Sequence, residues 1–153
     1  MNLAKTLPIN SRHATAYQTF FQKLKVVDWQ AIFLRLTSSH ERHKFTLTQN
    51  VLVIRQYRLF LFLLHEYPSL KMVPNQDIDA VLHAHTADVS QFEKDCENLF
   101  GVFLQHIPEV GRKEAERKEW LLTFARTQTL FEQNFGQGAM GSSVAACCEI
   151  LLI

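Results

Sequence analysis

Apolar residues recur at intervals of three and four along most of this chain, which is the spacing of a helix with one buried face. The first two runs cover residues 17–24 and 29–36, and Val27 and Asp28 separate them. This pattern predicts two short helices, or one helix that bends at Val27 and Asp28.

A longer periodic segment spans residues 51–64 and ends before Pro68, because a residue that precedes proline disfavours helical geometry. Between Leu59 and Leu64, apolar residues occupy every side of the predicted helix. A helix that is apolar all round is typical of a buried position. We therefore expect this segment to form the central helix of a bundle.

A third helix is predicted to begin after Pro74 and to continue to Gly101. Asn75 can cap its first amides, and the acidic side chains of Asp77 and Asp79 suit the positive end of a helix. Glycine is a common residue at a helix C-terminus, so Gly101 marks the expected end.

The chain after Gly101 predicts a turn at residues 106–111 and an amphipathic helix at residues 113–135. The sequence contains no alternating strand pattern of useful length. We therefore expect an all-α fold, a single-domain bundle of four to five helices over residues 14–135. Residues 136–153 are expected to form a hinge and an apolar tail that contains serine and cysteine.

The composition is that of one globular domain with no strong electrostatic field. Of the 153 residues, 47% are hydrophobic and 20% are charged, with 16 basic against 15 acidic side chains. Such a balance makes nucleic acid a poor candidate partner. No apolar run has the length of a signal peptide or a membrane span, and the three cysteines lack a CxxC spacing. We expect a soluble, cytoplasmic protein without a membrane partner, and its oligomeric state stays open.

Polar chemistry is concentrated inside the third predicted helix, around His83 and His85. Asp79 and His83 are four residues apart and share one face, whereas His85 and Asp88 share another. The two histidines therefore point in different directions. The main interpretation is a structural network in which these four residues and His106 join neighbouring helices, because buried polar groups need partners.

A metal site is the alternative interpretation of the same residues. His85 and Asp88, completed by His106, would offer three nitrogen and oxygen ligands for a divalent metal and leave one position open. Cys96 lies about 16 Å beyond His85 along a continuous helix, which is too far for the same site. Cys96 is expected to be a buried structural thiol.

The tail after Gly136 has three interpretations. In the first, Ser142 or Ser143 caps a short final helix that docks on the bundle. In the second, Ser142, Ser143, Cys147 and Cys148 are modified by enzymes, and the folded part of the chain serves as a leader. In the third, the two cysteines bind a soft metal ion with further ligands that the sequence does not identify.

Twelve positions between Asp79 and Pro108 follow the pattern D-x-x-[W/L]-H-x-H-x-x-D-x-x-x-[Y/F]-x-x-D-C-x-x-x-F-G-x-x-x-x-H-x-P. In this pattern the chain resembles the glycine-rich domain-containing protein-like family, and the resemblance covers roughly residues 51–136. Leu82 stands where members of that family usually have Trp, and the tail is neither glycine-rich nor cysteine-rich as in many of them. The resemblance implies a helical domain without an established reaction.

The sequence thus favours a non-enzymatic helical scaffold or interaction module that needs no cofactor and has a protein partner of unknown identity. A precursor of a modified peptide, with residues 1–135 as the leader, is one alternative. A metal-binding protein or metal-dependent enzyme is the other, with His85, Asp88 and His106 as its ligands.

Overall fold

The computed structural model describes residues 14–38 and 45–153, and these residues form mainly helices. The elements in chain order are α2 (Ala14–Leu24), α3 (Trp29–Ser38), α4 (Leu47–Glu66), α5 (Gln76–Thr86), α6 (Val89–Phe100), β1 (Leu104–Pro108), α7 (Glu114–Phe135) and β2 (Cys148–Leu152). None of the described helices combines the length and the apolar composition that crossing a lipid bilayer requires.

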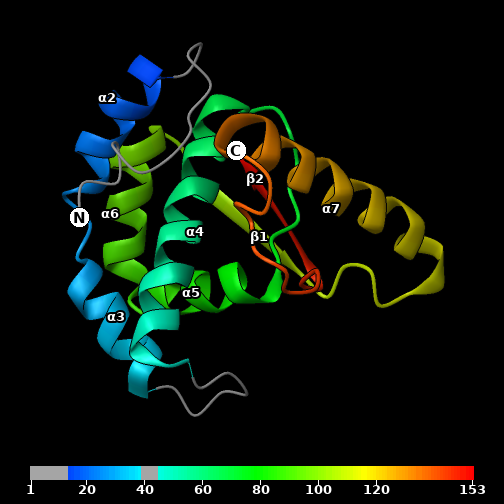
Figure 1. Cartoon of the computed structure of the whole chain (residues 1–153), viewed down its shortest axis with the longest axis horizontal. Coiled ribbons are helices and arrows are strands. Elements are labelled where there is room, and N and C mark those ends of the chain that lie inside the picture. Colours follow the sequence, from blue (N-terminus) through cyan, green and yellow to red (C-terminus); the bar gives the residue numbers. More distant parts are fainter. Residues whose placement is uncertain (1–13, 39–44) are drawn as a thin grey trace.

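Helix α4 is the centre of the molecule, as the sequence predicts. All six residues from Leu59 to Leu64 are buried, and α4 packs against α2, α3, α5 and α7. Figure 1 shows α4 between α2 and α3 on one side and α7 on the other. Its first turn is fixed by a capping box, in which the side chains of Thr46 and Gln49 each accept a hydrogen bond from the other residue's backbone amide.

The third predicted helix is two helices, which corrects the prediction of one continuous helix. Helix α5 ends at Thr86, and the side chain of Asp88 accepts a hydrogen bond from the Gln91 amide as the N-cap of α6. Asn75 caps α5, and Gly101, with a φ of 71°, ends α6, both as predicted. An acidic residue inside a predicted helix can thus be the cap that starts a new one.

A small antiparallel sheet corrects the all-α prediction. Strand β1 occupies much of the predicted turn, and β2 forms where a final helix was one interpretation. The register pairs Leu104 with Leu152, His106 with Ile150 and Pro108 with Cys148. Each strand has five residues, which is too short for a clear alternating pattern. The fold is therefore mostly helical, with one two-stranded sheet.

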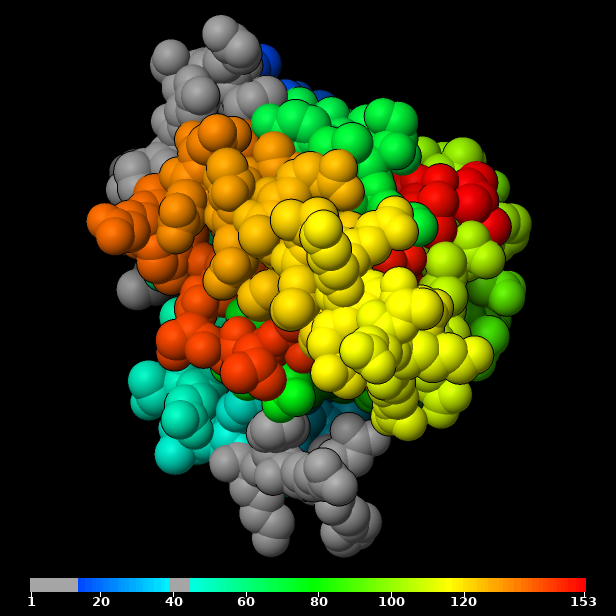
Figure 2. All heavy atoms as spheres, turned by 90° about the vertical axis from the view of Figure 1, so that its right-hand side faces the viewer, coloured from blue at the N-terminus to red at the C-terminus, as the bar shows by residue number. Residues whose placement is uncertain are grey.

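The chain after Gly136 docks on the helical part of the molecule. Ser143 Oγ accepts a hydrogen bond from the Asp77 amide, so it helps to cap α5 and not a helix of its own. The Ala146 carbonyl accepts a hydrogen bond from the Trp120 indole N–H, and the Ala146 amide donates a hydrogen bond to the Pro74 carbonyl. In Figure 2, α7 and the segment before it cover one face of the molecule, and C-terminal residues are visible at its margin.

We expect Gly111→Ala to destabilise the fold. Gly111 has a φ of 86°, and an added Cβ would lie 2.3 Å from the Trp120 ring, so the indole would have to move. Gly138→Ala is the matched control, because Gly138 has a φ of 77° and nothing within 4 Å of an added Cβ. Because of the clash, the free energy of unfolding in urea should be about 1–3 kcal/mol lower for Gly111→Ala than for the control. Equal losses would show that the Trp120 contact is unimportant.

Candidate metal centre

Four side chains from three segments meet where the first turns of α5 face the two-stranded sheet. Asp79 and His83 lie one turn apart on α5, His106 lies on β1, and Cys148 is the first residue of β2. Asp79 is in the middle of this cluster. Its Oδ2 is 3.4 Å from His83 Nε2, and its Oδ1 is 3.5 Å from both His106 Nε2 and Cys148 Sγ.

The distances from the Asp79 oxygens to His83 and His106 are long for hydrogen bonds and fall in the range between neighbouring ligands of a metal ion. Nitrogen to oxygen distances of 3.4 and 3.5 Å are longer than the range of about 2.7–3.2 Å for good hydrogen bonds. In a tetrahedral zinc site with bonds of about 2.0–2.3 Å, neighbouring donors lie about 3.3–3.8 Å apart. The donor atoms of Asp79, His106 and Cys148 all lie within 4.8 Å of one another.

His106 has a ring nitrogen that is buried beside the Asp79 carboxylate. Its Nε2 is shielded from solvent and has no hydrogen-bond partner among the described residues, although it faces the Asp79 carboxylate. A buried polar atom without a partner costs free energy, and a water or an ion at this position would offset that cost.

Cys148 is the least exposed member of the cluster. Burial raises the pKa of its thiol well above the usual range, and the neighbouring Asp79 carboxylate raises it further. The thiol is therefore protonated at neutral pH and its Sγ faces Asp79 Oδ1 as a weak donor. A bound metal ion would instead favour the deprotonated thiolate of Cys148, because a metal ion deprotonates a coordinating thiol.

The predicted metal ligands His85, Asp88 and His106 do not come together. His85 is buried, with Nδ1 2.7 Å from the Tyr57 hydroxyl and Nε2 2.7 Å from Asp95 Oδ2, so both ring nitrogens have partners. Asp88 is exposed and caps α6. Only His106 of the three lies in the cluster around Asp79.

His85 instead joins three helices through a buried hydrogen-bonded chain. Tyr57 on α4 donates to His85 on α5, which donates to Asp95 on α6. The side-chain Nε2 of Gln91 donates to the other oxygen of Asp95. Burial lowers the pKa of His85, although Asp95 opposes this, so the neutral imidazole fits the chain. Burial likewise keeps the pKa of Tyr57 well above its usual value.

The remaining predicted residues are members of neither group. Cys96 is buried as expected, and burial raises the pKa of its thiol to about 11, so it is an unreactive thiol at neutral pH. In the tail, Ser142 and Cys147 are exposed, whereas Ser143 is bonded to the Asp77 amide. Cys147 and Cys148 therefore differ in their surroundings, since Cys147 is exposed just before β2 and Cys148 is buried as its first residue.

The sequence pointed to parts of the cluster but not to the whole. The spacing of Asp79 and His83 places them on one helical face, and the structure confirms their contact. Cys148 and Asp79 are 69 residues apart, and only the pairing of β2 with β1 brings the thiol to the carboxylate. The thiol-metal interpretation of the tail did not identify further ligands, and the structure places Asp79 of α5 and His106 of β1 beside Cys148.

We expect the buried His85 to make stability fall in mild acid. Because its pKa in the folded protein is below that of an exposed histidine, the unfolded chain takes up the proton first as the pH falls below about 6.5. With a chelator present, the free energy of unfolding of the wild-type protein should therefore fall more steeply with falling pH than that of His85→Gln. The difference should reach up to about 1.4 kcal/mol per pH unit. Urea unfolding between pH 7.5 and 5 measures this, and parallel pH profiles for the two proteins would contradict it.

No family model, no curated protein and no solved structure matches this chain. The resemblance to the glycine-rich domain-containing protein-like family, which rests on the pattern between Asp79 and Pro108, stays a prediction.

Proposed function

We propose that this chain is a helical scaffold domain that binds one zinc ion through Asp79, His83, His106 and Cys148. The observation that carries the proposal is that donor atoms of Asp79, His106 and Cys148 lie within 4.8 Å of one another, and that His106 Nε2 is buried without a hydrogen-bond partner among the described residues. His83 Nε2 lies 3.4 Å from the other Asp79 oxygen, which makes it the candidate for a fourth ligand. The sequence offered a metal site at His85, Asp88 and His106 as an alternative, and the site proposed here shares only His106 with it. The proposal replaces the expectation that the protein needs no cofactor.

The chemistry of the donor set favours zinc over other common cations. A thiolate and imidazoles suit Zn²⁺, whereas Mg²⁺ and Ca²⁺ need mostly oxygen ligands and octahedral or larger coordination. Cu(I) prefers sulfur-rich sites, and Cys148 is the only sulfur in this cluster. Asp79, His106 and Cys148 form the buried side of the site, and the half-exposed His83 closes it as the fourth ligand.

A zinc ion at this position would fasten the last strand to the rest of the fold. The ion would link α5 to both strands, and a two-stranded sheet by itself is only marginally stable in water. Metal binding and docking of the tail would then be coupled, because each one stabilises the other. Such a closed site is a structural one, in line with the scaffold interpretation.

The docked tail supports the scaffold over the modified-peptide precursor. Cys148 and Ile150 are buried, and Ser143 is bonded to the first turn of α5. A modifying enzyme would have to detach β2 before it could reach Cys148. Cys147 and Ser142 stay accessible, so an intact, unmodified mass of the protein from its native host would remove the precursor as a rival.

We expect protein purified without an affinity tag to hold about one equivalent of zinc by elemental analysis. Cobalt should replace zinc and give the visible charge-transfer band of a thiolate ligand. Cys148→Ser should abolish this band and weaken zinc binding at least about 100-fold, a loss beyond that from removing a supporting partner. Asp79→Asn and His106→Gln should also weaken it.

Cys147→Ser is the matched control for these substitutions, since it removes the exposed neighbouring thiol. It should keep both the stoichiometry and the cobalt band. Equal effects of the two serine variants, or wild-type protein that takes up no zinc or cobalt, would overturn the proposal.

Zinc binding should also release close to one proton from Cys148. Burial keeps the pKa of this thiol well above 9, so the thiol is still protonated when the metal arrives at pH 7.5. Calorimetric titrations in buffers of different ionisation enthalpy measure the released protons. Cys147→Ser should release the same number, and zinc binding without proton release would exclude Cys148 as a ligand.

A further inference from the structure

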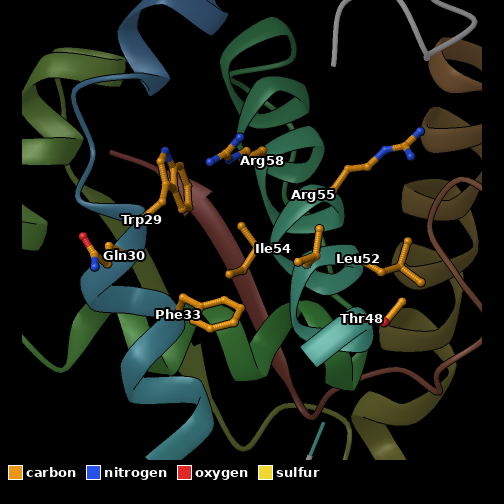
Figure 3. Close-up of a pocket in the computed structure, with 9 residues that line it drawn as sticks. Trp29, Gln30, Phe33, Thr48, Leu52, Ile54, Arg55 and Arg58 are labelled. Carbon is orange, nitrogen blue, oxygen red and sulfur yellow. The ribbon is translucent and has the colours of Figure 1, made fainter. Parts of the chain in front are cut away.

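A mostly apolar groove lies between α3 and the first half of α4, away from the residues of the metal cluster. It has a volume of about 650 Å³, and the walls include Trp29, Phe33, Leu52 and Ile54. Figure 3 shows the two sides, with Trp29 and Phe33 on α3 facing Ile54 on α4. The volume is within the range of about 300–1,000 Å³ that is typical of sites for small organic ligands.

Arg58 forms the polar end of this groove. Its guanidinium lies over the Trp29 ring, 4.3 Å from the centroid, and Figure 3 shows the two side chains directed toward each other. Burial lowers the pKa of Arg58, and its Nε is shielded from solvent and has no hydrogen-bond partner in residues 14–38 and 45–153. Among the described residues no carboxylate lies within 4 Å of Arg58.

A half-buried guanidinium without an anion is an expensive arrangement. Removing a cation from water costs free energy that a carboxylate or phosphate normally offsets. The Trp29 ring compensates in part through a cation–π contact. The guanidinium keeps donors for an anion, because a ring contact uses the face of the group and leaves its N–H edge free. Arg55 also lines the groove, but Figure 3 shows it directed away from Trp29.

We propose that this groove binds an amphipathic carboxylate of the size of a medium-chain fatty acid. The carboxylate pairs with the N–H edge of Arg58, and the alkyl chain lies along Phe33, Ile54 and Leu52. The planar fork of one guanidinium matches a carboxylate, and its single charge balances the single charge of that group, whereas a phosphate monoester carries up to two charges. The apolar walls offer few donors or acceptors for a peptide backbone, which favours an alkyl chain over a protein segment.

The groove and the metal cluster share no residue, so the two proposals are independent. The groove is built by α3 and α4, and the cluster by α5, β1 and β2. Asp79→Asn should therefore leave binding in the groove unchanged.

Calorimetric titration with decanoate, below the concentration at which it forms micelles, tests the proposal. We expect saturable binding of one decanoate per chain, with decanol at least about tenfold weaker and decyltrimethylammonium weaker still, since both lack the carboxylate. Arg58→Met keeps a linear apolar side chain and should weaken decanoate binding at least about tenfold while leaving decanol unchanged.

Arg126→Met is the matched control, because Arg126 is exposed on α7, outside the groove. It should keep wild-type affinity. Leu52→Glu is a second variant for the case in which Arg58→Met does not fold, since Leu52 is 48% exposed and the new carboxylate would repel the ligand. Equal affinity for decanoate and decanol, no effect of either groove variant, or binding to anionic vesicles without binding to monomeric decanoate would overturn the proposal.

Discussion

The pairing of the last strand with β1 is the constraint on which the rest of this structure depends. The register sets Cys148 opposite Pro108 and Ile150 opposite His106, and the carbonyl and amide of Met72 form a second bridge to Ile150. Once β2 is in this position, its first residue faces the first turn of α5. The tail thereby becomes part of the core, and its thiol reaches Asp79.

Two histidines that are separated by a single residue have opposite roles because a helix turns about 100° per residue. His83 points toward the surface and approaches Asp79, one turn earlier on the same helix. His85 points inward and joins Tyr57 and Asp95 in a chain that links three helices. The same type of side chain is therefore a ligand candidate in one case and a structural connector in the other. The difference is burial and the identity of the partners.

Helical periodicity predicted most of the fold, because it reports which face of each segment is buried. The central position of residues 59–64, the cap at Asn75 and the end at Gly101 are confirmed. The break at Asp88 was missed, because an aspartate can cap a helix or lie on the solvent face of one, and only its bond to the Gln91 amide distinguishes the two. Of the candidate site, the pair of Asp79 and His83 could be predicted from spacing alone.

By itself, the sequence determined most of the helices, the buried centre and the different directions of His83 and His85, since these follow from contacts between residues close in the chain. Tertiary structure alone decided that residues 148–152 form a strand, that Cys148 lies beside Asp79 and His106, and that Arg58 lies over Trp29 at the end of an apolar groove. The physical reason is that strand pairing and side-chain clusters depend on partners far away in sequence. A five-residue segment carries too little local preference to specify such partners.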